Sequence, residues 1–267
     1  MAAFAGQVVA VTGASEGIGR AFCLELAPQR PRLVLAARNV ERLQSLAAEC
    51  RALGAEARVV PTDVTDEASC RALIEAAVTD FGGVDVLVNN AGGTMWTRLD
   101  EIRDLSIFEQ LMRLNYLGSV YPTYHALPHL QRSRGRIVGV SSMAGLIGVP
   151  TRTGYSAAKH AVIGFFESLR VELDGSGVSV TLICPDFVVS EIHKRALGPD
   201  GRPLGDNPMQ NSNIMTAEEC ARLMIDAIER RQRMLVTSGR GKLARWLQLL
   251  RPQMIDRMAA RAIREKN

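Results

Sequence analysis

The stretch that decides the fold is Val8-Val9-Ala10-Val11-Thr12-Gly13-Ala14-Ser15-Glu16-Gly17-Ile18-Gly19. Its β-branched beginning predicts a strand, and an amphipathic pattern through about Leu26 predicts the helix that follows. Glycines in such a turn let the backbone approach a pyrophosphate at the positive end of the helix. The Gly-x-x-x-Gly-x-Gly spacing differs from the commoner Gly-x-Gly-x-x-Gly, but strand, turn and helix follow one another as a dinucleotide-binding turn requires.

Further short apolar runs alternate with longer helical patterns along the rest of the chain. They are Leu33 to Ala37, Arg58 to Pro61, Val86 to Val88, Ile137 to Ser141, Val178 to Ile183 and Met234 to Thr237. This alternation predicts an α/β Rossmann fold, with a doubly wound, seven-stranded parallel sheet between two layers of helices. The 267 residues contain no low-complexity linker, so we expect a single domain over residues 1–238 and an extension over residues 239–267.

Composition excludes several classes of protein. The five cysteines are odd in number and lack a CxxC pair, which argues against a disulfide framework and fits a reducing compartment. The N-terminus has no basic leader and no apolar run is long enough to span a membrane, which predicts a cytoplasmic protein. The net charge of +4 comes from the extension, which holds eight basic and two acidic residues. A nucleic-acid-binding core is therefore disfavoured.

Two polar residues follow predicted strands at their carboxyl ends, where open α/β sheets bind ligands. Ala37 stands where a site that prefers NAD typically carries an acid, and Arg38 comes next. Its guanidinium could pair with a 2′-phosphate, which favours NADP, or it could be an ordinary exposed arginine. Asp63 could accept a hydrogen bond from an adenine amino group, or it could cap the helix that begins near Asp66.

Amides mark a second group of candidate positions. In Asn89-Asn90-Ala91-Gly92-Gly93, small residues would let the backbone pass close to a flat ligand while the amides tie neighbouring strands together. Asn115 lies within a predicted helix, where its side chain either bonds something specific or faces solvent. His125 and His129 are four apart, but Pro128 should disrupt the helix between them and no third ligand is evident. We therefore expect no metal site.

The most distinctive segment is Tyr155-Ser156-Ala157-Ala158-Lys159, with Ser142 upstream. On a helix, Tyr155 and Lys159 lie one turn apart on the same face. An adjacent ammonium would lower the pKa of the phenol from about 10 toward neutrality, so the tyrosine could act as an acid or base. A serine hydroxyl could then hold the reacting oxygen. A packed ring beside a solvated charge is the alternative interpretation.

These segments together resemble the classical short-chain dehydrogenase/reductase family over about residues 6–238. The resemblance rests on Thr12-Gly13-x-x-x-Gly17-x-Gly19, Asn89-Asn90-Ala91-Gly92, Asn115, Ser142 and Tyr155-x-x-x-Lys159. It implies that Tyr155 exchanges a proton with the substrate oxygen and that Ser142 hydrogen-bonds this oxygen. Lys159 would bond the nicotinamide ribose and lower the tyrosine pKa. Asn115 would hold a water that links the lysine to solvent.

The resemblance also implies a set of cofactor-binding residues. These are Thr12, Gly13, Ser15, Gly17, Ile18, Gly19, Arg38, Asp63, Val64, Asn90, Ala91, Gly92, Tyr155, Lys159, Pro185, Val188 and Ser190. The chain departs from the family at Pro185-Asp186, where Pro-Gly is common, and a carboxylate there could change the backbone beside the nicotinamide carboxamide. Ser190 occupies the position of a threonine that usually contacts this amide.

Residues 187–216 are rich in glycine and proline, which predicts a mobile lid over the substrate. Their apolar side chains would line an apolar pocket or pack the lid onto its own core. We expect an NADP(H)-dependent enzyme that interconverts a secondary alcohol and a ketone or aldehyde, on a steroid-, lipid- or retinoid-like substrate. A non-enzymatic dinucleotide sensor or scaffold and a 3-oxoacyl-type reductase are the alternatives.

The extension contains two short amphipathic patterns separated by Pro252. Two such helices would lie on an anionic membrane surface, with Trp246 at the interface, or pack against protein. The C-terminal half and this extension are similar to the membrane-associated branch that contains the 11β-hydroxysteroid dehydrogenases. The family resemblance further implies a homodimer or homotetramer that pairs the helices containing Asn115 and Tyr155. Part of that surface, unless it faces the sheet, would come from Ala161, Phe165, Ser168 and Leu169.

Overall fold

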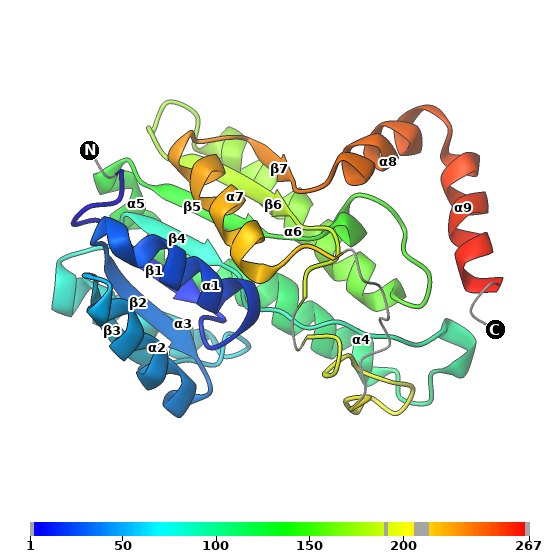
Figure 1. Ribbon diagram of the computed structural model, residues 1–267, viewed down its shortest axis with the longest axis horizontal. Helices are drawn as coiled ribbons and strands as arrows, with labels where there is room; N and C mark the ends of the chain where they lie inside the picture. The colour runs from blue at the N-terminus through cyan, green and yellow to red at the C-terminus, as the bar shows by residue number, and fades with distance from the viewer. Residues whose placement is uncertain (1–2, 190–191, 206–213, 265–267) are drawn as a thin grey trace.

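The computed structural model describes residues 3–189, 192–205 and 214–264. A parallel seven-stranded sheet in the order β3-β2-β1-β4-β5-β6-β7 forms its centre (Figure 1). The strands are β1 (Val8–Thr12), β2 (Arg32–Ala37), β3 (Glu56–Pro61), β4 (Val86–Asn89), β5 (Arg136–Val140), β6 (Ser179–Cys184) and β7 (Met234–Val236). All expected strands are present, and the predicted α/β Rossmann architecture is confirmed.

Helices cover both faces of the sheet. One face carries α1 (Gly17–Leu26), α2 (Val40–Ala52) and α7 (Ala217–Glu229), and the other carries α3 (Glu67–Phe81), α5 (Gly118–Ser133) and α6 (Thr153–Glu172). Successive side chains of β1 alternate between the two cores: Val9 and Val11 pack on the first side, Val8 and Ala10 on the second. Burial on both faces explains why the central strands, such as β1 and β4, read as continuous apolar runs.

The sheet order reverses between β1 and β4. From β1 the chain moves outward to β2 and β3, and then returns to build β4 through β7 on the other side. At such a reversal the two connections leave in opposite directions, which opens a crevice at the carboxyl ends of the strands. Gly13 follows β1 and Asn90 follows β4, so both lie at this crevice.

Helix α5 does not break at its prolines. It runs without interruption through Pro122 and Pro128, so the expected break between His125 and His129 is wrong. Each proline removes only one backbone donor, and the helix is held by a buried face that includes Ala126. The histidines nonetheless have separate partners, Glu67 and Arg132. Within the part of the chain that the structure describes, no cluster of metal-ligating side chains occurs.

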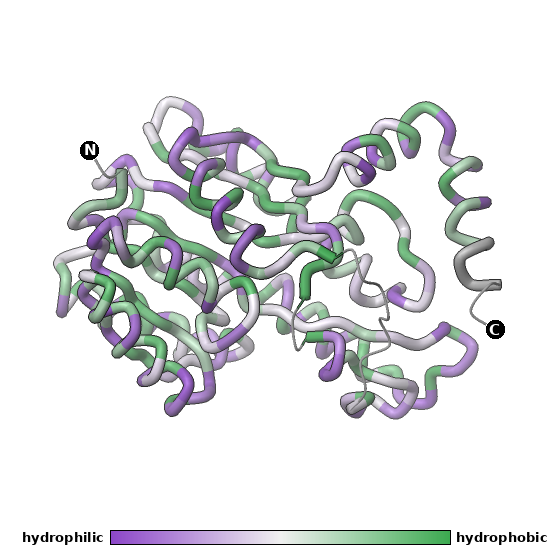
Figure 2. Tube along the Cα trace, viewed as in Figure 1, coloured by the Kyte–Doolittle hydropathy of each residue, from purple (hydrophilic) through white to green (hydrophobic). Residues whose placement is uncertain are grey.

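The C-terminal extension forms the two expected helices, α8 (Gly239–Leu250) and α9 (Pro252–Arg264). They project from the end of β7 and turn back toward the side of the molecule that holds α4 (Ser106–Leu111) (Figure 1). Apolar and polar residues alternate along both helices (Figure 2). None of the described helices is long and apolar enough to cross a bilayer.

The five cysteines are all buried and free. Burial of apolar side chains in the two layers that enclose the sheet stabilises the fold.

Candidate active site

A cavity of about 1250 Å³ opens at the carboxyl ends of the strands. Its walls come from the segments that follow β1 through β6, together with the start of α6. The lid and the C-terminal extension complete it, through Ile192, His193 and Arg195 on one side and Ile255 and Met258 on the other. The cavity therefore extends from the crevice at the sheet to the lid and the C-terminal extension, neither of which contributes a strand to the sheet.

The glycine-rich turn is shaped by three positions that exclude side chains. Gly13 and Gly17 have φ angles of +64° and +53°, a left-handed conformation that favours glycine. A Cβ added to Gly19 would lie 2.3 Å from the Gly13 carbonyl oxygen and 2.5 Å from Asn90 Nδ2. The first turn of α1 can therefore approach the loop closely, which is the geometry that a dinucleotide phosphate needs. The residues present fit that group.

Asn90 and Thr12 lock this turn to the neighbouring strand. Asn90 Nδ2 donates to the carbonyl oxygens of Thr12 and Gly13, at 3.0 and 3.1 Å. The Thr12 hydroxyl accepts from the backbone N–H groups of Asn90 and Ala91 and donates to the carbonyl of Val88. The expected role of the amides in tying strands together is confirmed for Asn90, whereas the Asn89 amide donates to Thr123 of α5. Thr12 and Gly19 support the cavity from beneath and do not line it.

Glu16 connects three elements at the rim of the cavity. Its carboxylate accepts from Arg42 of α2 at 2.7 Å and also pairs with Arg195 of the lid. Leu197 of the lid donates its N–H to the Thr94 carbonyl, and Trp96 donates back to the Leu197 carbonyl. Arg103 adds further bonds, from its N–H to the Pro199 carbonyl and from its guanidinium to Asp200, so several contacts fasten the described part of the lid. Ser190 and residues 206–213 lie outside the described residues.

Arg38 and Asp63 both line the cavity. Arg38 is exposed at the rim. Burial raises the pKa of Asp63, but two hydrogen bonds from Thr65 and the charge of Arg38 outweigh it and leave that pKa below its usual value. The alternative role of Asp63 as a helix cap is wrong, because Asp66 caps α3 through the N–H groups of Ala68 and Ser69.

Tyr155 and Lys159 lie one turn apart on α6, as expected, and both are buried. Lys159 Nζ lies 5.8 Å from the centre of the tyrosine ring and donates to the Val140 carbonyl at 2.9 Å. Burial lowers the pKa of Lys159 to about 8, so its ammonium gives up its proton more readily than that of an exposed lysine.

The pKa of Tyr155 is raised, contrary to the expectation that Lys159 lowers it. Burial is the largest influence, and the hydrogen bond to Ser142 and the charge of Arg152 offset it only in part. The reason for the difference is geometric. The ammonium of Lys159 lies near the tyrosine ring and donates its hydrogen bond to the Val140 carbonyl rather than to the phenol oxygen. The phenol lies in a low-dielectric pocket, which disfavours its charged form.

Asn115 is fully buried in a π-helical turn, Met112–Leu117, so a solvent-facing side chain is excluded. Its amide nitrogen donates to the carbonyls of Gly93 and Leu111, and its amide oxygen accepts from the N–H of Gly93. The side chain therefore clamps the loop that follows β4. A Cβ on Gly92 would lie 2.7 Å from that oxygen and 3.3 Å from Lys159 Nζ.

Asp186 bonds the C-terminal extension. Its carboxylate accepts from Ser238 Oγ at 2.7 Å and from Arg240 Nε at 2.5 Å, and its N–H donates to Thr237 Oγ1. The residue that departs from the family pattern thus joins the end of β6 to the beginning of α8. Its side chain holds an added element of the fold in place.

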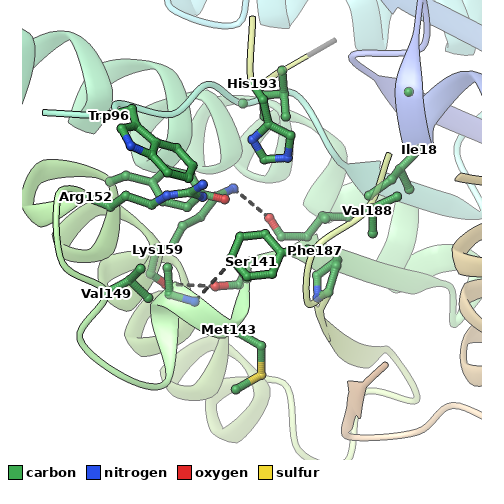
Figure 3. Close-up of a pocket in the computed structure, with 18 of the residues that line it drawn as sticks. Ile18, Trp96, Ser141, Met143, Val149, Arg152, Lys159, Phe187, Val188 and His193 are labelled. Atoms are coloured by element: carbon green, nitrogen blue, oxygen red, sulfur yellow. Dashed lines mark hydrogen bonds between the residues drawn. The ribbon is translucent and has the colours of Figure 1, made fainter. Parts of the chain in front are cut away.

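The structure brings most of the expected site residues to one cavity. The lining members are Gly13, Ser15, Gly17, Ile18, Arg38, Asp63, Val64, Asn90, Ala91, Gly92, Ser142, Tyr155, Lys159, Pro185 and Val188. Phe187 also lines the cavity and belongs to the segment whose apolar side chains were expected to line a pocket, but sequence reasoning missed Trp96, Arg152 and His193 (Figure 3). These three residues come from separate segments, and no spacing along the chain indicates that they meet.

Comparison with known proteins agrees with this geometry. Residues 7–198 match the pattern of the short chain dehydrogenase family. The chain is 37% identical over 235 residues to a Pinus massoniana protein named 11-beta-hydroxysteroid dehydrogenase, which covers 85% of this chain and 66% of that protein. It is 41% identical over 226 residues to human dehydrogenase/reductase SDR family member 7, covering 82% and 66%. The chain thus spans just under two thirds of the length of these two relatives.

A solved structure extends the agreement to three dimensions. A short chain dehydrogenase/reductase from Burkholderia phymatum, in complex with NAD, superposes with a TM-score of 0.83 at 30% identity. The superposition covers 95% of this chain and 96% of that one.

Proposed function

The chain belongs to the short-chain dehydrogenase family, and from this premise we propose that it is an NADP(H)-dependent oxidoreductase that interconverts an alcohol and a ketone or aldehyde. The observation that carries the proposal is the meeting of Tyr155, Ser142 and Lys159 at the cavity that the glycine-rich turn also lines. The bound nicotinamide would supply the hydride. The protein would supply binding, orientation and the proton.

The residues that would hold the dinucleotide surround the turn after β1. The backbone between Gly13 and Ile18 and the positive end of α1 suit the phosphates, Asp63 suits the adenine, and Lys159 suits the ribose. The loop that Asn115 clamps places Gly92 beside that lysine. Asn115 would act as a positioning residue, because its amide holds this loop through Gly93. It would also hold a water molecule that links Lys159 to solvent.

The proton chemistry falls to Tyr155. Its raised pKa keeps the phenol protonated at neutral pH, which suits a group that donates a proton to a forming alkoxide. Ser142, which hydrogen-bonds the phenol, would hold the substrate oxygen beside it. In the reverse direction the deprotonated form of Tyr155, the phenolate, would accept the proton from the alcohol. A sensor or scaffold without activity needs none of these buried groups, which favours the enzyme.

The substrate side of the cavity supports an apolar compound. It is lined by Met143, Ile147, Val149, Phe187, Ile192, Ile255 and Met258. A panel of carbonyl compounds, followed by NADPH oxidation, tests the proposal. Turnover of apolar ketones or aldehydes is the expected result. If no carbonyl in the panel is reduced although NADPH binds, the proposal fails and the sensor remains.

The preference for NADP rests on Arg38, which has no acidic residue before it. We expect Ala37→Asp combined with Arg38→Leu to weaken NADPH binding and to improve NADH binding. A charge-assisted bidentate contact is worth roughly 1.5 to 3 kcal/mol, or about ten- to hundredfold in affinity. Isothermal titration of both cofactors measures the change, and Arg51→Leu on α2 removes the same charge away from the cavity. Equal wild-type affinities for the two cofactors would contradict the preference.

The extension suits a peripheral contact with an anionic membrane. Leu249 and Leu250 are 70% and 74% exposed, while Ile255 and Met258 of the next helix reach the cavity. A membrane under α8 would therefore lie close to the route by which an apolar substrate enters. The second possibility, that the extension packs on a partner subunit, uses the same exposed residues.

We expect the wild-type protein to sediment with anionic vesicles at low salt, because apolar insertion and basic headgroup contacts act together. Leu249→Ser combined with Leu250→Ser should abolish sedimentation and spare the bond between Asp186 and Arg240. Val171→Ser on α6 removes an equally exposed apolar residue, at 75%, and serves as the control. Wild-type protein that ignores anionic vesicles at low salt would assign the extension to protein packing, and vesicle binding that is unchanged in the double variant would exclude Leu249 and Leu250 from the contact.

A homodimer or homotetramer remains part of the proposal. Leu169 packs into the core beside the sheet and does not belong to the expected subunit surface. Ala161 and Ser168 are accessible on α6, next to an open Gly164. Those positions are where a second subunit would pack.

A further inference from the structure

Arg152 is a buried arginine whose charge has no polar partner. It precedes α6, three residues before Tyr155, and is only 6% exposed. Among residues 3–189, 192–205 and 214–264, none forms a hydrogen bond or ion pair with its guanidinium, and its Nη2 atom is buried without a partner. Burial lowers the pKa of this arginine, yet a guanidinium stays charged at neutral pH. An uncompensated charge in such a place is unfavourable unless a ligand pairs with it.

Two aromatic rings hold the guanidinium in place. Its carbon atom lies 4.3 Å from the centre of the Trp96 ring and 5.5 Å from that of Phe187. Figure 3 shows Trp96 directly beside Arg152, with Phe187 across the pocket. Ring faces attract a cation but accept no conventional hydrogen bond in the plane of the guanidinium. They therefore fix its orientation and leave its donors available.

His193 adds a neutral polar group to the same pocket. It is 6% exposed and its Nδ1 atom is buried without a partner. Burial lowers the pKa of this histidine to about 4, and the charge of Arg152 contributes to the lowering. The ring is therefore uncharged at neutral pH, and Arg152 carries the positive charge of this group.

In the described part of the chain, none of the acids that line the cavity pairs with Arg152, and each bonds other groups. Glu16 pairs with Arg42 and Arg195, and Asp186 with Arg240. Asp63 accepts two hydrogen bonds from Thr65, and Glu101 bonds the N–H of Arg98. Lys159, the other buried cation of the lining, donates to a backbone carbonyl. On the substrate side of the cavity, Arg152 therefore offers hydrogen-bond donors that no acceptor in the described residues uses.

We propose that Arg152 binds the carboxylate of an acidic substrate. The substrate class is an apolar ketone, aldehyde or alcohol that also carries a carboxylate, which deepens and rests on the function proposed above. A guanidinium presents paired N–H donors that match the two oxygens of a carboxylate. One unpaired cation beside a neutral histidine matches a single negative charge better than a phosphate dianion. The apolar lining accepts the rest of the molecule.

The test measures binding to the full chain without cofactor, independently of turnover. The chain has two tryptophans, so Trp246→Phe leaves Trp96, which contacts Arg152, as the only tryptophan reporter. Dodecanoate, 1-dodecanol and dodecyl phosphate are titrated below their micellar concentrations, and the fluorescence of Trp96 is followed. We expect dodecanoate to bind at least tenfold more tightly than dodecanol, and more tightly than dodecyl phosphate.

Variants then assign the preference to one side chain. Arg152→Gln should bring dodecanoate down to the affinity of dodecanol, Arg152→Lys should restore part of the difference, and Arg103→Gln, outside the cavity, should change nothing. Equal wild-type affinity for acid and alcohol overturns the proposal, as does an acid preference that survives in Arg152→Gln. Tighter binding of dodecyl phosphate rejects the carboxylate.

Far-UV circular dichroism and NADPH titration verify that Arg152→Gln folds, and Arg152→Lys carries the same test if it does not. The function proposed above fails separately, through absence of NADPH binding or of carbonyl reduction. A protein that reduces neutral ketones but ignores dodecanoate would keep the enzyme and lose its acidic substrate.

Discussion

Replacing Tyr155 with phenylalanine should lower turnover by a factor on the order of 10² to 10⁴, the contribution typical of a positioned proton donor. The ring is buried at 7% exposure and packs with Met95 and Leu111, and phenylalanine keeps that packing. Only the hydroxyl that bonds Ser142 is lost. The measurement is kcat for a carbonyl substrate found in the panel, followed by NADPH oxidation.

The effect should appear in kcat while NADPH affinity stays within a few-fold of wild type, since the cavity loses no wall. Tyr124→Phe is the matched control, because that phenol is 71% exposed on α5 and lies outside the cavity. Turnover of Tyr155→Phe equal to that of the control would remove the tyrosine from the chemistry and leave the proposed mechanism without its proton donor.

Substituting Gly19 by alanine should abolish cofactor binding, with a loss of at least about 10²-fold in NADPH affinity. The added Cβ would lie 2.3 Å from the Gly13 carbonyl oxygen and 2.5 Å from Asn90 Nδ2. Neither can yield easily, because the first is backbone and the second is held by two hydrogen bonds. The turn must move, and a displacement near 1 Å at a binding site costs on the order of 10²-fold.

Isothermal titration with NADPH measures this loss, and thermal unfolding shows whether the fold survives. Gly164→Ala is the control, because a Cβ at that position of α6 meets nothing within 4 Å, and alanine favours a helix over glycine. It should bind NADPH normally and unfold at the same or a higher temperature. An unchanged NADPH affinity in Gly19→Ala would mean that the turn after β1 does not hold the cofactor.

The strands could be predicted because each is an apolar run bounded by turn residues, and β1 matches its expected range of Val8 to Thr12. The continuity of α5 through Pro128 could not be predicted, since the apolar face of α5 packs on the sheet and outweighs one missing backbone donor. Local propensity is visible in sequence. The tertiary contact that overrides it is not.

The same limit applies to the site. Tyr155 and Lys159 were predicted from their spacing on one helix, but the pKa of the tyrosine depends on burial and on Arg152, which only the fold brings into account. Arg152 and His193 belong to separate segments and carry no motif. They line the same cavity only because the fold brings their segments together, and this is a property of long-range packing.

The alternation of side chains along β1 has a consequence for how such an enzyme changes over time. The turn that suits the cofactor is backed by α1 on one face of the sheet, while Tyr155 stands on α6 on the other face. Each layer has its own apolar core, so a lineage can remodel the recognition of one ligand without repacking the support of the other. The turn after β1 can therefore change without repacking the layer that carries Tyr155, while Lys159 on α6 keeps one proposed cofactor contact in the second layer.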